Sequence, residues 1–114
     1  MSRPKKYAHI DFVCPDAVAE NAKTGLELRR EFRRGGTVVG VSRARDLKNR
    51  RNLSPSTIRR MTQYFARHVI DKRAKDFGNA NDPSTGYVAW LLWGGDEGRK
   101  WAEGIEAEME KADS

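Results

Sequence analysis

The chain has 114 residues, of which 38% are hydrophobic and 33% are charged, and its formal net charge at pH 7 is +6. This length predicts one domain with one core, and no apolar run approaches the roughly 20 residues that cross a bilayer. Cys14 is the only cysteine, which excludes an internal disulfide and fits a reducing compartment, so we expect a cytoplasmic protein without a membrane partner.

Residues 1–14 are predicted to form a basic N-terminal arm, residues 15–111 a single α-helical domain and residues 112–114 a tail. The first helix is predicted over residues 15–34, since apolar residues recur near helical spacing and Gly35 and Gly36 follow as a stop signal. Gly25 within this helix costs about 1 kcal/mol relative to alanine. It therefore marks either a close packing contact or a kink.

Residues 37–48 are predicted to form a short helix that Thr37 caps. Val38 and Val41 are expected to point inward, together with Ala44 or Arg45. The β-branched residues at the start of this segment leave a two-stranded element as the alternative.

The clearest helix start in the chain lies at Ser54 and Pro55, where a serine can cap and a proline suits the first helical position. The helix is predicted to continue to Arg73, with Tyr64 off its apolar stripe. The predicted inner face consists of Ile58, Met61, Phe65 and Val69.

Asp82 and Pro83 repeat the same start signal before a segment that is apolar on nearly every side. This fourth helix, up to Gly94 and Gly95, is predicted to be the buried centre of the fold. Asp96 is predicted to cap the last helix. Five helical segments with short connections predict an all-α, compact bundle.

Charge is distributed unevenly along the chain. Between residues 29 and 60 eleven lysines and arginines face two acids, whereas residues 96–114 carry a net charge of −4. Arginine dominates the basic block, and its planar guanidinium matches phosphate oxygens. We expect nucleic acid, DNA foremost, to bind there, through Arg29, Arg30, Arg33, Arg34, Arg43, Arg45, Lys48, Arg50, Arg51, Arg59, Arg60 and Gln63. The acidic end leaves pairing between copies, a homo-oligomer, as an open alternative.

The helices predicted over residues 37–48 and 54–73, joined by a short polar turn, have the layout of a helix-turn-helix. The start of the second helix would then meet base edges while the first helix and the turn hold phosphates. Two helices and a turn are common in α proteins, however, and the turn lacks the expected small residue. The pair is therefore described as helix-turn-helix-like, and we expect weak sequence preference.

No other chemistry is indicated. The three tryptophans lie in or beside the most apolar stretch and are expected to pack in the core, which leaves Tyr64 as the better candidate for base stacking. His9 and His68 have no partners at metal-ligand spacing, and no nucleophile, base and orienting group can be assembled. We expect no metal site, no cofactor and no enzyme activity, and His68 is expected to be a partly buried hydrogen-bonding residue.

Four strings in the chain resemble a family of small, uncharacterised proteins of tailed phages, including phages of cyanobacteria. They are GGTVVGV at 35–41, LSPSTIRRM at 53–61, YFARH at 64–68 and GYVAWLLWGGD at 86–96. The resemblance implies phage origin and a location in the host bacterial cytoplasm or in the virion. It brings no activity and no site residue.

The sequence therefore favours a phage-encoded DNA-binding protein that contacts phosphates through an Arg-rich face. The alternative is a virion component or an inhibitor that binds an acidic host or phage protein. Preference for single or double strands is left open.

Overall fold

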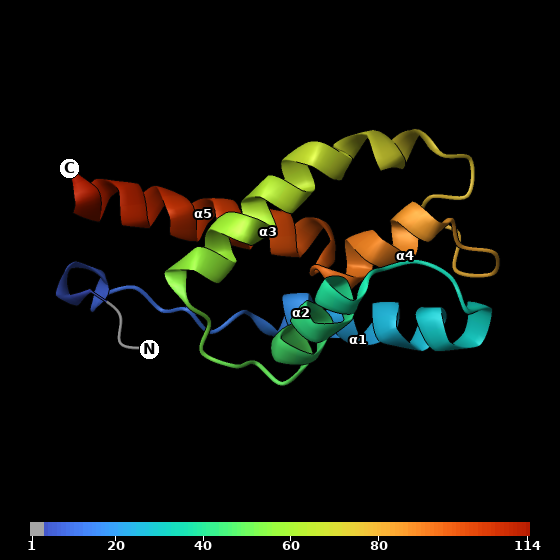
Figure 1. Ribbon diagram of the computed structural model, residues 1–114, viewed down its shortest axis with the longest axis horizontal. Coiled ribbons are helices and arrows are strands. Elements are labelled where there is room, and N and C mark those ends of the chain that lie inside the picture. The colour runs from blue at the N-terminus through green and yellow to red at the C-terminus, as the bar shows by residue number, and fades with distance from the viewer. Residues whose placement is uncertain (1–3) are drawn as a thin grey trace.

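The computed structural model describes residues 4–114, and all regular structure in this range is helical (Figure 1). The predicted all-α bundle of five helices is confirmed, with two short 3₁₀ helices in addition. The elements in chain order are η1 (Lys5–Tyr7), α1 (Asp16–Phe32), α2 (Val38–Lys48), α3 (Pro55–His68), η2 (Val69–Arg73), α4 (Thr85–Leu92) and α5 (Gly95–Asp113).

Helix α4 is the centre of the fold, as its apolar sequence predicts. It contacts α1, α2, α3, α5 and η2, and the side chains of Val88, Trp90 and Leu92 are buried. Gly25 allows α1 to lie against it, because a Cβ atom at that position would be 2.8 Å from the backbone nitrogen of Leu92. The close packing contact was the correct alternative at Gly25.

The molecule is elongated, with extents of 45 × 25 × 22 Å. Helix α5 extends along much of the long axis of the molecule, and α3 packs across α5. Helices α1 and α2 pack on each other, and in Figure 1 they lie below α4, whereas η2 lies above it. Next to the C-terminal end of α5 lies η1. There the Tyr7 hydroxyl donates to a carboxylate oxygen of Asp113 at 2.7 Å, and Lys6 Nζ is also 2.7 Å from that oxygen.

The segment before α1 belongs to the core, which corrects the predicted arm over residues 1–14 as far as it is described; residues 1–3 lie outside the described range. Ile10, Phe12 and Cys14 are buried at alternate positions, as on one face of an extended chain. The Phe12 carbonyl accepts a hydrogen bond from the Leu53 amide at 3.1 Å. At the other end α5 continues to Asp113, into the predicted tail over residues 112–114.

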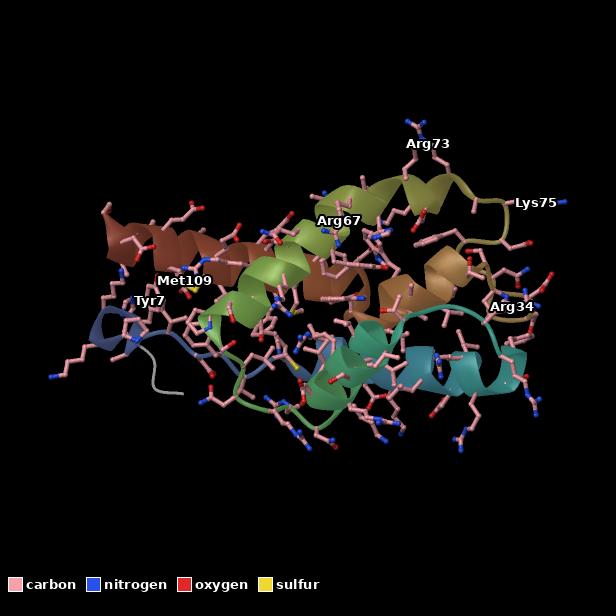
Figure 2. All side chains as sticks on the ribbon, in the orientation of Figure 1. Tyr7, Arg34, Arg67, Arg73, Lys75 and Met109 are labelled. Atoms are coloured by element: carbon pink, nitrogen blue, oxygen red, sulfur yellow. The ribbon has the colours of Figure 1, made fainter. Side chains whose placement is uncertain are left out.

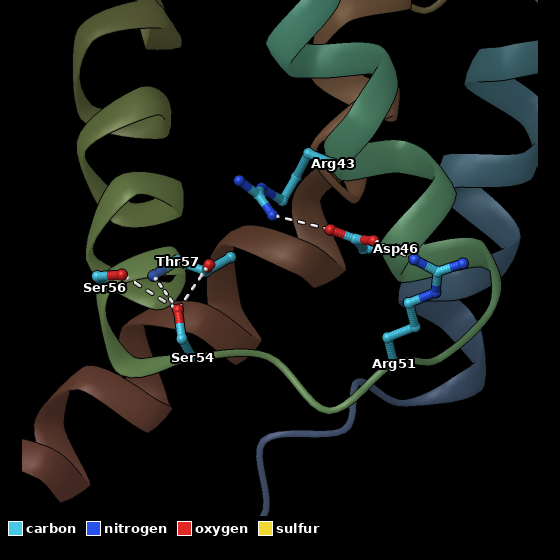
Figure 3. A network of polar contacts seen from close by, with 6 residues as sticks. All are labelled: Arg43, Asp46, Arg51, Ser54, Ser56 and Thr57. Atoms are coloured by element: carbon cyan, nitrogen blue, oxygen red, sulfur yellow. Dashed lines mark hydrogen bonds and ion pairs between the residues drawn. The ribbon is translucent and has the colours of Figure 1, made fainter. Parts of the chain in front are cut away.

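Two predicted helix starts are confirmed by their hydrogen bonds. The Thr37 hydroxyl accepts from the Gly40 amide at 3.1 Å at the start of α2, and the Ser54 hydroxyl accepts from the Thr57 amide at 3.2 Å at the start of α3. Figure 3 shows the Ser54 hydroxyl meeting the first turn of α3. Pro55 occupies the first helical position, where its missing amide hydrogen is not needed.

The starts of α4 and α5 differ from the prediction. Ser84, and not Asp82, caps α4 by accepting from the Tyr87 amide at 3.1 Å. Gly94 is the N-cap of α5, and Asp96 lies in the first turn instead. The Asp96 carboxylate accepts from the Trp90 indole at 2.9 Å and from Lys72 at 2.7 Å, so it joins α5 to α4 and η2.

Two valines predicted to face inward are exposed. Val38 is 87% exposed, because the buried face of α2 runs through Gly40, Ala44 and Leu47. Val69 is 39% exposed, since α3 ends at His68 and the chain continues as a 3₁₀ helix with a tighter period, which breaks the stripe of the preceding helix.

Candidate nucleic-acid interface

A groove between α1 and α2 gathers part of the basic block; we call it the basic groove. Leu26 and Val41 form its apolar floor, and its volume is about 400 Å³. The charged residues along its walls are Lys23, Glu27, Arg29, Arg30, Arg45 and Lys48.

Helical periodicity explains this grouping. Residues three, four and seven positions apart share one face of a helix, so Lys23, Glu27 and Arg30 line the α1 wall. Arg45 and Lys48 line the α2 wall in the same way. The alkyl stems of such side chains can lie along an apolar floor while their charged ends stay in water.

The cations of the basic groove are largely uncompensated. Within residues 4–114 the side chains of Lys23, Arg30, Arg45 and Lys48 make no ion pair and no hydrogen bond to protein. Arg29 donates to the Gly35 carbonyl at 3.2 Å, and Glu27 is the one acid in the walls. A groove with this charge excess attracts anions from a distance.

Arg33 and Arg34, at the C-terminal end of α1, do not line the basic groove. Arg33 ends the helix in a left-handed conformation, with φ of 53°. Arg34 donates to the Asp82 carboxylate and to the Pro83 carbonyl, both at 3.1 Å. Figure 2 shows Arg34 at the end of α1 that faces the loop before α4. Arg34 therefore connects α1 to that loop.

Three more predicted residues are held by an acid or by the backbone. Arg43 and Arg51 share Asp46, at 3.1 and 3.3 Å (Figure 3). Arg50 donates to the Cys14 carbonyl at 2.8 Å and lies 3.3 Å from Asp16. Burial lowers the pKa of Arg43, which Asp46 partly offsets. Arg50 and Arg51 thereby connect the loop between α2 and α3 to the segment before α1 and to α2.

Helices α2 and α3 do not pack against each other, since the backbone of α2 is nowhere in contact with the backbone of α3. The pair is thus two consecutive helices joined by a loop, without the packed unit of a helix-turn-helix. Arg59 of α3 donates to the Tyr7 hydroxyl at 3.2 Å. Arg60 and Gln63 line a separate cleft of about 580 Å³ between α3, α4 and the start of α2.

The aromatic side chains pack internally. Trp90 and Trp93 are buried, which confirms their predicted core role, and Trp101 is half-buried against the core. Tyr64 is only 5% exposed and its ring stacks on that of Trp93. The prediction that Tyr64 offers a surface for base stacking is therefore wrong. Half-buried His68 lies 3.3 Å from Asp71, as a hydrogen-bonding residue should.

Two basic residues that line the basic groove or the larger cleft were not among the binding residues predicted from the sequence. Lys23 lies seven residues before Arg30 and lines the basic groove, and Arg67 lies seven residues after Arg60 and lines the larger cleft. A seven-residue spacing returns to the same face of a helix, so this spacing was the signal that could have found both.

No family model, curated protein or solved structure matches this chain. Among the described helices none is both long and apolar enough to cross a membrane. Within residues 4–114 no three His, Cys, Asp or Glu side chains are grouped so that they could hold a metal ion.

Proposed function

We propose that the chain is a phage-encoded protein that binds nucleic acid, DNA foremost, through phosphate contacts in the basic groove. The observation that carries this proposal is a set of four cations along one groove with a single acid in its walls. These cations, which have no partner within residues 4–114, are Lys23, Arg30, Arg45 and Lys48. Phosphate contacts of lysine and arginine supply most of the affinity of sequence-independent binding.

The same geometry supports weak sequence preference. Phosphate contacts position a protein on DNA but carry no sequence information. Arg60 and Gln63, two of the residues in the second helix that were predicted to read bases, line a different cleft from the basic groove. The proposal therefore excludes a reading role for the start of α3.

Several arginines predicted to bind DNA are already bonded within the protein, and the proposal assigns them no phosphate contact. Arg34, Arg43, Arg50, Arg51 and Arg59 are each hydrogen-bonded or ion-paired within the protein. A phosphate would have to displace those partners, whereas Lys23, Arg30, Arg45 and Lys48 have no partner to displace within residues 4–114. We expect the first group to matter for stability and the second for affinity.

Binding of labelled duplex and single-stranded DNA, followed by fluorescence anisotropy, tests the proposal. The groove variant Arg30→Gln/Arg45→Gln removes two phosphate contacts and is expected to bind roughly 30-fold more weakly at 0.15 M salt. The control variant Arg73→Gln/Lys75→Gln removes the same charge from exposed residues, which Figure 2 shows pointing away from the body of the protein. It should change affinity less than about threefold.

Equal losses in the groove and control variants would contradict the proposal, as would absence of micromolar binding by the wild-type chain. Tighter binding to a folded acidic protein than to DNA of equal charge would favour the alternative, a virion component or an inhibitor of an acidic host or phage protein.

A further inference from the structure

The larger cleft, which we call the aromatic cleft, lies on the opposite flank of α2 from the basic groove. Val39 of α2 faces the aromatic cleft, whereas Val41 and Arg45 face the groove. Its volume of about 580 Å³ is that of a site for a small molecule. Ala89 and Trp93 of α4 contribute apolar surface to it.

Two cations on α3 line the aromatic cleft. Arg60 and Arg67 lie seven residues apart on one helical face, and within residues 4–114 neither has an ion pair or a side-chain hydrogen bond to protein. Asp71 is the one acid in the lining, and it already meets His68 at 3.3 Å. The cleft therefore carries an excess of positive charge.

Two helix starts also line the aromatic cleft, α2 through Thr37 and α4 through Thr85 and Gly86. The first amides of a helix have no acceptor within it, and the helix dipole adds partial positive charge there. Gly86 is required at this point, because a Cβ atom would lie 2.7 Å from the Cβ atom of Asp71.

A buried hydroxyl in the lining independently points to a ligand. Tyr64 is only 5% exposed, and its hydroxyl has no hydrogen-bond partner among the described residues. Burial raises the pKa of Tyr64, with a further rise from nearby Asp71 and an opposing effect of Arg67, so the hydroxyl stays protonated as a donor. An unpaired buried hydroxyl destabilises the fold, so a ligand that accepts its hydrogen bond is favoured.

We propose that the aromatic cleft binds a phosphate monoester, with its phosphate between Arg60 and Arg67 and one oxygen accepting from the Tyr64 hydroxyl. A phosphate presents acceptor oxygens in several directions, which suits side-chain donors on α3 together with the first amides of α2 and α4, whereas a planar carboxylate suits a single guanidinium. The Tyr64 hydroxyl is covered by neighbouring atoms, so the phosphate reaches it only after a side chain of the lining moves. The ester group then lies over Ala89 and Trp93.

A free nucleotide and the 5′-phosphate end of a DNA strand share this chemistry. The proposal does not depend on the basic groove, since the two sites lie on opposite flanks of α2. A chain that binds DNA without binding mononucleotide would overturn the cleft proposal alone, and the reverse result would overturn the groove proposal alone.

Calorimetric titration of the full chain with thymidine 5′-monophosphate, and with thymidine as the uncharged comparison, tests the proposal. We expect a dissociation constant of about 1 mM or below for the monophosphate. Arg67→Gln and Tyr64→Phe, which each remove one hydrogen bond to the charged phosphate, should raise it roughly tenfold. Lys100→Gln, an exposed charge on α5, is the matched control and should leave it unchanged.

A six-nucleotide oligothymidylate with and without a 5′-phosphate identifies the source. If the 5′-phosphate increases the affinity, and Arg67→Gln abolishes this increase, the ligand is a strand end. If the 5′-phosphate does not increase the affinity, the ligand is the free nucleotide. Equal binding of thymidine and its monophosphate, or equal losses in Arg67→Gln and Lys100→Gln, would overturn the proposal. Tyr64→Phe retains the ring stack, so a binding loss in that variant reports the hydroxyl itself.

Discussion

The ring of Tyr64 lies flat on the ring of Trp93, with the centroids 4.5 Å apart and the planes 7° apart. Tyr64 belongs to α3 and Trp93 to the end of α4, while the guanidinium of Arg43 on α2 lies 5.8 Å from the same indole. Figure 3 shows Arg43 reaching from α2 toward α3. Aromatic packing on α4 thus links two helices whose backbones do not meet, and leaves the aromatic cleft between them.

Removing the Tyr64 hydroxyl is expected to preserve or raise stability. Tyr64→Phe keeps the stack and eliminates a buried donor that has no partner among the described residues, so the free energy of unfolding should stay equal or rise by up to about 1 kcal/mol. Tyr7→Phe is the control, because its hydroxyl donates to Asp113 and accepts from Arg59. That variant should lose about 1 kcal/mol in chemical denaturation. A larger loss in Tyr64→Phe than in Tyr7→Phe would contradict this account.

Adding a methyl group at Gly25 should destabilise the contact between α1 and α4. Its Cβ atom would meet backbone atoms of Leu91 and Leu92 at 2.8–3.0 Å. We expect Gly25→Ala to lower the free energy of unfolding by about 1–3 kcal/mol, despite the higher helix propensity of alanine. At Gly104 in α5 nothing lies within 4 Å of the added atom, so Gly104→Ala should gain about 1 kcal/mol. Equal losses of stability in Gly25→Ala and Gly104→Ala, measured by thermal unfolding, would contradict a close approach of α1 to α4 at Gly25.

The carboxylate of Asp96 should contribute stability that depends on pH. Hydrogen bonds from Lys72 and then from Trp90 lower its pKa. A carboxylate whose pKa is lower in the folded state stabilises the fold above its unfolded pKa of about 3.9, and this contribution is lost as pH falls through the folded pKa.

Asp96→Asn is therefore expected to reduce the free energy of unfolding at pH 7 by about 0.5–1 kcal/mol, since the Asp96 side chain is 66% exposed and its pair with Lys72 is screened. The difference from wild type should shrink below pH 4 and nearly vanish at pH 2, as measured by urea denaturation. A difference that stays constant from pH 7 to pH 2 would show that charge is not its cause.

Much of the fold could be predicted because local chemistry decides it. Thr37 and Ser54 cap their helices through their own hydroxyls, and a segment without a polar face must be buried. Tyr64 was misjudged because a single stripe was assigned to α3, although this helix packs against both α5 and α4 and so has two buried faces. Which neighbours a helix meets is a property of the tertiary structure, and the periodicity of one helix does not contain it.

In the candidate site, too, local sequence could be interpreted but tertiary contacts could not be predicted. The basic block is continuous along the chain, but α2 turns Arg45 toward the basic groove and Arg43 toward the indole of Trp93. Ion pairs such as that of Arg34 with Asp82 depend on acids distant in sequence. Composition therefore predicts a class of partner, whereas the basic residues without a partner among residues 4–114 could be distinguished from the paired ones only in three dimensions.

The central claim, binding of nucleic acid by the basic groove, is tested most directly by the salt dependence of duplex DNA binding for wild type and for Arg30→Gln/Arg45→Gln. If the four groove cations that have no partner within residues 4–114 each contact a phosphate, the logarithm of the affinity should fall with the logarithm of salt concentration with a slope of about −3.6. The variant should have a slope weaker by about 1.8, because two contacts are lost. A flat salt response of the wild type, or equal slopes for the two proteins, would contradict the claim.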